Sequence, residues 1–213
     1  MQQKSIIIFL LFVLSLPVFS QKVSVIADGG YSHRLFLIPD STNKSYSEYL
    51  KGKRPGKNFG IEAIYYNEGH GFGFKFSTFL NSVSGKNIDT TLFNKVNINE
   101  NIRINYFSLQ YHWQNQISNL PLFYEVCAGL GLIRYKSEGK EDEEKSVILG
   151  KSYGMNAAFS FEYAIFEHLS LGSSVDFMIG KLVQGTHNGY IYNFKPQENI
   201  TRLDLNLFTR FSF

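Results

Sequence analysis

Leu203-Asp204-Leu205-Asn206-Leu207-Phe208-Thr209-Arg210-Phe211-Ser212-Phe213 is the stretch that decides the fold of this chain. Its apolar side chains stand at positions 203, 205, 207, 211 and 213, and polar side chains stand at 204, 206, 210 and 212. A period of two places one kind of side chain on each face of an extended strand. The stretch therefore predicts a β-strand that has one apolar and one polar face and continues to Phe213.

The other end of the sequence has the pattern of a secretory signal. An apolar run from Ile6 to Leu16 is followed by Val18 and Ser20, at the positions that a signal peptidase reads. The run is too short for a hydrocarbon core of ~30 Å, which a helix crosses with about 20 residues. We expect residues 1–20 to be a cleaved signal peptide and residues 21–213 to form one mature domain.

The composition favours β-structure and excludes some functional classes. The 213 residues include 20 Phe, 13 Tyr and 18 Gly, which suits strands with tight bends. The formal net charge of +3 is too small to indicate a nucleic-acid partner. Cys127 is the single cysteine, so no intramolecular disulfide is expected.

The pattern along the chain predicts eight strands, at 23–38, 58–68, 71–82, 101–115, 122–136, 151–165, 169–183 and 201–213. The links between them alternate in length: short links at 69–70, 116–121 and 166–168 alternate with long polar links at 39–57, 83–100, 137–150 and 184–200. Barrels of the outer membrane have short periplasmic turns and longer extracellular loops. We therefore predict an all-β, eight-stranded antiparallel up-and-down transmembrane β-barrel in the bacterial outer membrane, with both termini periplasmic and the long loops extracellular.

The predicted strands have one bulky apolar face and one sparsely charged face. Phe72, Phe74 and Phe76, for example, alternate with Gly73 and Lys75. A membrane barrel turns its apolar face to lipid and its polar face to the lumen. The residues predicted to form a structural network of charges in a narrow polar lumen are Glu62, Lys75, Glu125, Glu162, Asp176, Asp204 and Arg210. These charges are expected to pair, because an unpaired buried charge is costly.

One segment departs from this alternation. Ile102, Ile104 and Tyr106 have the opposite phase to Phe107 and Leu109 in the fourth predicted strand. A β-bulge, or emergence of the strand above the bilayer, would account for the change.

Two stretches resemble a known family. Ile104-Asn105-Tyr106-Phe107-Ser108-Leu109-Gln110-Tyr111, followed by a turn and by Leu122-Phe123-Tyr124 to Ala128-Gly129-Leu130-Gly131, resembles the central hairpin of small eight-stranded outer-membrane proteins of Bacteroidetes. These proteins are the OmpX/OmpA-type or PorT-like barrels, and the Pro that is frequent in the first of the two strands is absent here. The terminal Leu207, Phe211 and Phe213 resemble the assembly signal of such barrels. The resemblance implies fold and location but no particular activity, because one fold hosts unrelated functions.

No group of residues predicts catalysis or metal binding. Glu167, His168 and Ser170 are the residue types of a lipid A deacylase site, but His168 is in a short turn and hence at the periplasmic end, away from lipid A. The five histidines are scattered without metal-ligand spacing. We therefore expect no catalytic, cofactor-binding or metal-binding residues.

The sequence thus favours a non-catalytic structural or surface-interaction role. A narrow porin-like channel for small solutes is the first alternative, and a lipid A-modifying enzyme is the second. The expected partners are outer-membrane lipid and lipopolysaccharide, the outer-membrane insertion machinery during assembly, and an envelope or surface protein. Basic residues between Lys44 and Lys57 offer contacts to lipopolysaccharide phosphates, and acidic residues between Lys136 and Lys145 offer weak binding of divalent cations.

Overall fold

The computed structural model describes residues 22–38, 44–89, 95–141 and 144–213, so the predicted signal peptide lies outside the described residues. The strands are β1 (Lys22–Arg34), β2 (Pro55–Asn67), β3 (His70–Asp89), β4 (Lys95–Gln116), β5 (Leu122–Glu141), β6 (Glu144–Phe166), β7 (Leu169–His187), β8 (Tyr190–Asn199) and β9 (Arg202–Ser212). One helix, α2 (Lys44–Gly52), lies between β1 and β2. No helix in the described ranges is long and apolar enough to cross a bilayer.

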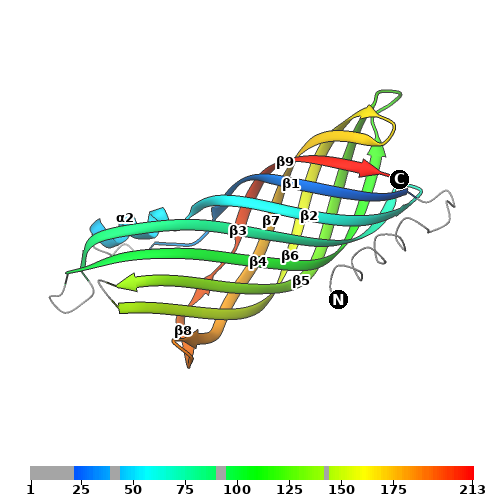
Figure 1. Cartoon of the computed structure of the whole chain (residues 1–213). Coiled ribbons are helices and arrows are strands. Elements are labelled where there is room, and N and C mark those ends of the chain that lie inside the picture. Colours follow the sequence, from blue (N-terminus) through cyan, green and yellow to red (C-terminus); the bar gives the residue numbers. More distant parts are fainter. Residues whose placement is uncertain (1–21, 39–43, 90–94, 142–143) are drawn as a thin grey trace, which may run out of the picture.

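The strands form a closed antiparallel ring. Each strand from β1 to β7 pairs with the next, and β9 pairs with both β7 and β1 (Figure 1). Strands β8 and β9 follow one another along β7, since Lys181 faces Asn199 of β8 and Met178 faces Arg202 of β9. They therefore share one position in the wall, interrupted at 200–201. The ring has eight positions, and the predicted eight-stranded up-and-down barrel is confirmed.

The expected extent of the long links is wrong. Strand β3 continues to Asp89, β5 to Glu141 and β7 to His187, so most of 83–100, 137–150 and 184–200 is strand. The five strands β3 to β7 contain 20, 22, 20, 23 and 19 residues, whereas about 9–11 residues cross a membrane. These segments are polar because they are strands that continue past the bilayer into water. Figure 1 shows them reaching toward the end that carries α2.

The outer surface of the barrel has a continuous apolar belt. On β6 the outward side chains of Tyr153, Met155, Phe159, Phe161 and Tyr163 are each more than 40% exposed. Water-soluble proteins rarely expose a contiguous apolar surface of this size, whereas transmembrane barrels present one to lipid. Beyond Tyr153 the next outward side chain of β6 is charged, Lys151.

The inner face of β4 has no bulge at the change of phase. The pairing of β4 with β5 is continuous from Ile98 to Gln116, and Ile102, Ile104 and Tyr106 point inward in the same phase as the buried Ser108 and Gln110. The bulge explanation is therefore wrong. The inner face itself changes from polar to apolar at this height.

An apolar cluster explains that change. It fills the interior on the side of α2, and its buried members are Phe79, Ile102, Ile104, Tyr106, Ile133, Tyr135, Met178, Leu182 and Ile200. The expectation of a polar lumen is therefore wrong for this part of the barrel. A small cavity between facing strands can be closed by apolar packing as well as by ion pairs, and here both occur.

Candidate functional site

All seven residues predicted to point into the lumen are buried inside the barrel, with 6% exposure or less. Arg210 lies between two carboxylates: its Nη2 is 2.7 Å from Glu125 Oε2 and its Nε is 3.0 Å from Glu162 Oε2. The Tyr66 hydroxyl donates to Glu125 as well. This part of the network lies toward the end where the short turns are, because Glu125 and Glu162 are near the turns of β4–β5 and β6–β7.

A second part of the network lies closer to the apolar cluster. Lys75 Nζ is 2.5 Å from Asp176 Oδ2, although Lys75 faces Glu62 in the register of β2 and β3. Arg202 Nε donates to Asp204 Oδ2 at 3.0 Å, and the Ser32 hydroxyl donates to the other oxygen of Asp204. The network thus brings together Lys75 with Asp176 and Arg210 with two glutamates, whereas Asp204 pairs with an arginine outside the predicted set.

His112 is a member of the network that the sequence analysis missed. Its Nε2 is 2.9 Å from Glu62 Oε1 and its Nδ1 is 3.0 Å from Glu125 Oε1. A sequence signal was present, since His112 stands in the polar phase of β4 with Ser108 and Gln110. Histidine spacing alone does not reveal this role, because the partners of His112 are carboxylates on β2 and β5.

The network leaves little free space. A cavity of about 30 Å³ adjoins Asp28, Glu62, Lys75 and Glu125, which is room for about one water molecule. Among the described residues, no group of three or more His, Cys, Asp or Glu could hold a metal ion. The arrangement can brace the barrel and fill its interior.

The residues considered for catalysis are not assembled. His168 Nδ1 donates to the backbone carbonyl of Ser212 at 3.0 Å, which ties the β6–β7 turn to β9 rather than to Ser170. Cys127 is buried, with its Sγ 3.2 Å from Gln110 Oε1. These contacts fit structural positions.

Helix α2 covers the inner face of the strand extension. Tyr49 packs with Val83, Ile88 and Ile98 of β3 and β4. These strand residues are in the inward phase, so α2 lies over the mouth of the barrel as a cap. We call α2 with this inner surface the cap.

A buried carboxylate fixes the cap. Glu100 accepts hydrogen bonds from Ser137 Oγ at 2.5 Å and from the Tyr49 hydroxyl, and Lys53 Nζ lies 3.1 Å away. Burial alone would raise the pKa of Glu100, but the Lys53 charge and the two hydroxyl hydrogen bonds outweigh it and lower the pKa. Burial and the neighbouring Glu100 charge raise the pKa of Tyr49, which keeps this hydroxyl a donor.

Some charges of the two clusters noted in the sequence have partners within the chain. Lys53 binds Glu100, and Arg54 donates to the carbonyl of Phe36 at 2.7 Å, so both are engaged in the cap. In the acidic segment, Glu138 pairs with Lys136 at 2.7 Å. Asp142 and Glu143 lie outside the described residues, so the expected cation site is not described as a whole.

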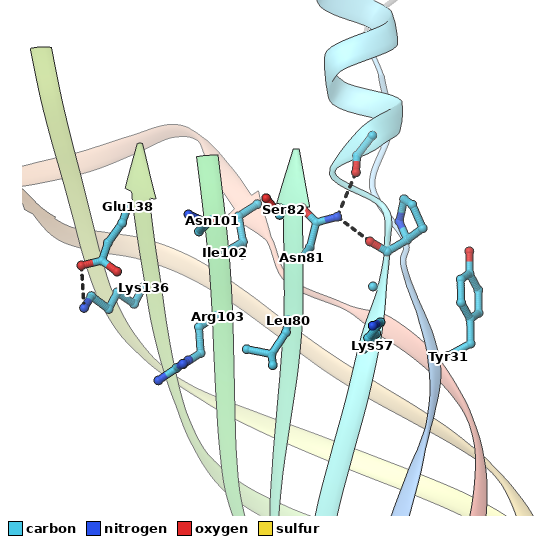
Figure 2. A pocket seen from close by; sticks show the side chains of 13 residues that line it. Tyr31, Lys57, Leu80, Asn81, Ser82, Asn101, Ile102, Arg103, Lys136 and Glu138 are labelled. Atoms are coloured by element: carbon cyan, nitrogen blue, oxygen red, sulfur yellow. Dashed lines mark hydrogen bonds and ion pairs between the residues drawn. The ribbon is translucent and has the colours of Figure 1, made fainter. Parts of the chain in front are cut away.

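A groove lies on the outer surface above the apolar belt. It has a volume of about 840 Å³ and is lined mainly by strand residues of β1 to β5 (Figure 2). Tyr31, Lys57, Leu80, Arg103 and Lys136 follow one another across these strands as register partners. Figure 2 shows Arg103 and Lys136 beside each other on neighbouring strands.

The residues of the predicted assembly signal lie on the outer surface. Leu207, Phe211 and Phe213 are 74%, 47% and 72% exposed. The backbone N–H of Phe213 donates to the carbonyl of Val23 at 2.9 Å, so the last residue still takes part in the pairing of β9 with β1.

Comparison with solved structures agrees with this fold. No protein-family model matches the chain, and no curated protein matches it. The chain is similar to neisserial surface protein A, with 12% identity and a TM-score of 0.55 over 92% of this chain and 98% of that one. It is similar to a major outer membrane protein of Thermus thermophilus, with 13% identity and a TM-score of 0.55 over 92% of this chain and 100% of that one. It is also similar to OprG of Pseudomonas aeruginosa, with 15% identity and a TM-score of 0.51 over 89% of this chain and 95% of that one. At these identities the likeness shows the barrel fold.

Proposed function

We propose that the protein is a closed outer-membrane barrel of the OmpX/OmpA-type or PorT-like kind, with a non-catalytic structural or surface-interaction role. One observation carries the proposal: the interior is filled by ion pairs and an apolar cluster, while β3 to β7 and α2 build an ordered extension beyond the belt. A filled barrel with a large extension suits presentation of a surface better than passage of a solute.

The proposed orientation places both termini in the periplasm and the extension outside the cell. The turns at 68–69, 117–121 and 167–168 lie at the same end as Phe213, and α2 lies at the other end (Figure 1). Short turns face the periplasm in barrels of this kind. Trp113 and Tyr124 contact each other near the short turns, with ring centroids 5.6 Å apart, as expected for an interfacial aromatic pair.

The tip of the β7–β8 hairpin supports a contact with another envelope or surface protein. Tyr190 and Ile191 are 80% and 78% exposed, next to the turn at Asn188 and Gly189. The tip is well beyond the lipid belt, so lipid does not account for these apolar side chains. Exposed aromatic and aliphatic side chains are frequent anchors of protein interfaces.

Three measurements test the role. Purified protein in planar bilayers should show no steady conductance, and an open channel of regular size would favour the porin-like alternative. The second is capture of partners from intact envelopes with wild-type protein and with Tyr190→Ser/Ile191→Ser. A partner captured only by wild-type protein supports a surface-interaction role. The third measurement is the mass of lipid A in expressing cells, and a changed mass would favour an enzyme.

A further inference from the structure

Basic side chains mark the border between the apolar belt and the polar extension on the outer surface. Lys57, Arg103, Arg134, Lys136, Lys151 and Lys181 form this set, and all six are exposed. Of these six, Lys136 is the one that forms an ion pair with a described residue, Glu138. The border therefore carries a large local excess of positive charge.

Two pairs of these cations face each other directly. Arg103 is the register partner of Lys136 on β4 and β5, and Arg134 is the register partner of Lys151 on β5 and β6. Directly opposite side chains lie about 4.5–5.5 Å apart at Cβ, and like charges in this position are destabilising. Arg103 and Lys151 form no ion pair with any described residue. An anion from outside the chain would relieve this repulsion.

An apolar groove lies on the same strands, separated from the two pairs by one row of outward side chains that includes Leu132 and Tyr153. Its volume is about 720 Å³, and it forms where the small Ala128, Gly129 and Ala157 stand among larger side chains of the belt. Ala128 and Ala157 are register partners on β5 and β6, the strands that also carry Arg134 and Lys151. Along β5 the distance from Arg134 to Ala128 is about 20 Å at roughly 3.3 Å per residue. This length and shape fit an acyl chain.

We propose that the outer surface of β4 to β6 binds a lipid whose headgroup carries two phosphate groups. The phosphates lie at the pairs Arg103/Lys136 and Arg134/Lys151, which are about 7 Å apart along β5, and an acyl chain lies in the groove at Ala128 and Ala157. Arginine binds phosphate through two parallel hydrogen bonds, and lysine adds a point charge. The inference rests on the proposed function, because only a membrane-embedded barrel meets lipid at this height.

Native mass spectrometry of the purified protein in detergent tests the site. The probes are phosphatidylcholine, bis-phosphorylated lipid A, the same lipid without its phosphates, and inorganic pyrophosphate. Wild-type protein should retain the bis-phosphorylated lipid in preference to the other two lipids. Arg134→Gln/Lys151→Gln should weaken that binding by about tenfold or more, because charge-assisted hydrogen bonds are lost.

A matched control is available on the same two strands. Lys140 and Lys145 are exposed register partners beyond the border, so Lys140→Gln/Lys145→Gln removes the same charge farther from lipid. This variant should bind the lipid like wild-type protein. Equal weakening in both double variants, or displacement of the lipid by pyrophosphate at comparable concentration, would overturn the lipid site.

The state of the barrel separates this outcome from failure of the proposed function. Each sample is also run heated and unheated on a gel. A heat-modifiable barrel that binds all lipids equally overturns the lipid site alone. A chain that forms no such barrel in lipid overturns the outer-membrane role and the lipid site together.

Discussion

Arg210 of β9 and Glu125 of β5 meet across the interior of the barrel, with Nη2 and Oε2 2.7 Å apart. Their strands are not neighbours in the ring, because β9 lies between β1 and β7. The ion pair therefore braces opposite parts of the wall against each other. The backbone ladders hold only adjacent strands, so this bracing is a separate source of rigidity.

Removal of Arg210 should destabilise the barrel strongly. Arg210→Met leaves Glu125 and Glu162 buried without their shared cation, and the expected loss is about 3–5 kcal/mol in the free energy of unfolding. Urea unfolding in lipid vesicles measures it. The control Lys181→Met removes an exposed cation and should change the free energy of unfolding by no more than about 0.5 kcal/mol. Adding Glu125→Gln to Arg210→Met should recover part of the loss in stability.

An arginine in the apolar belt should be costly. Phe74, Phe159 and Phe177 are exposed on the apolar belt, on β3, β6 and β7. Phe159→Arg is expected to cost roughly 2–4 kcal/mol, because the charge must leave water for the hydrocarbon. Phe159→Leu keeps an apolar side chain toward lipid and serves as the control. Equal stability of the two variants in vesicles would show that this face does not meet lipid.

Acid should loosen the cap. The pKa of Glu100 is lower in the folded cap than in an unfolded chain, where a glutamate titrates near pH ~4.3. The contribution of ionised Glu100 to the stability of the cap is therefore fully present above that pH. It is lost as the pH falls through the lower pKa of the folded state. Amide hydrogen exchange in α2, corrected for its intrinsic pH dependence, should accelerate as the pH falls below about 4.3.

Glu100→Gln provides the control for this pH dependence. The variant should open α2 more easily at neutral pH by about 1.5–3 kcal/mol, since hydrogen bonds to a charged group are lost. Its corrected exchange in α2 should then change little with acid. An unaltered acid response in the variant would assign the effect to another carboxylate.

Deletion of Phe213 should reduce assembly more than stability. The residue contributes one interstrand hydrogen bond to Val23, which is worth about 0.5–1.5 kcal/mol. If Phe213 is read by the insertion machinery, its deletion should sharply lower heat-modifiable barrel in the outer membrane while protein refolded in detergent loses only that small amount. Phe213→Trp keeps a terminal aromatic ring and should assemble normally. Unchanged insertion of the deleted chain would remove Phe213 from the signal.

Alternation allowed the facing of the strands to be predicted, but not their partners. Glu62 and Lys75 share an inward phase in the sequence, yet Lys75 binds Asp176 across the interior. Side-chain phase is set within a strand by a period of two, whereas pairing depends on register and on the curvature of the closed ring. Those quantities arise only when all strands are assembled.

Polarity alone does not reveal the extension of the strands, because loops are polar as well. Beyond the bilayer the outer face of a strand meets water, as a loop does. Both therefore carry polar residues, and composition no longer distinguishes strand from loop. One local signal was nevertheless present: Asn188-Gly189, with φ of 50° and 88°, is a favoured two-residue hairpin turn, and it joins β7 to β8. The inward phase of Ile102, Ile104 and Tyr106 is equally visible in the sequence. Their packing partners on β7 and at Ile200 can be identified only in the assembled barrel.

The pairing of β9 with β1 has a consequence for how the barrel folds. Ser24 and Ser212 are hydrogen-bonded through their hydroxyls at 2.9 Å, although 188 positions separate them in the sequence. Contacts between residues so far apart in the sequence are slow to form, because the chain loses the entropy of loop closure before the contact stabilises it. Until β9 has been synthesised, β1 and β7 each keep one unpaired edge, which is a template for aggregation. The nascent chain must therefore be held unfolded and shielded until its last segment is available, and closure completes the ring in a single late step.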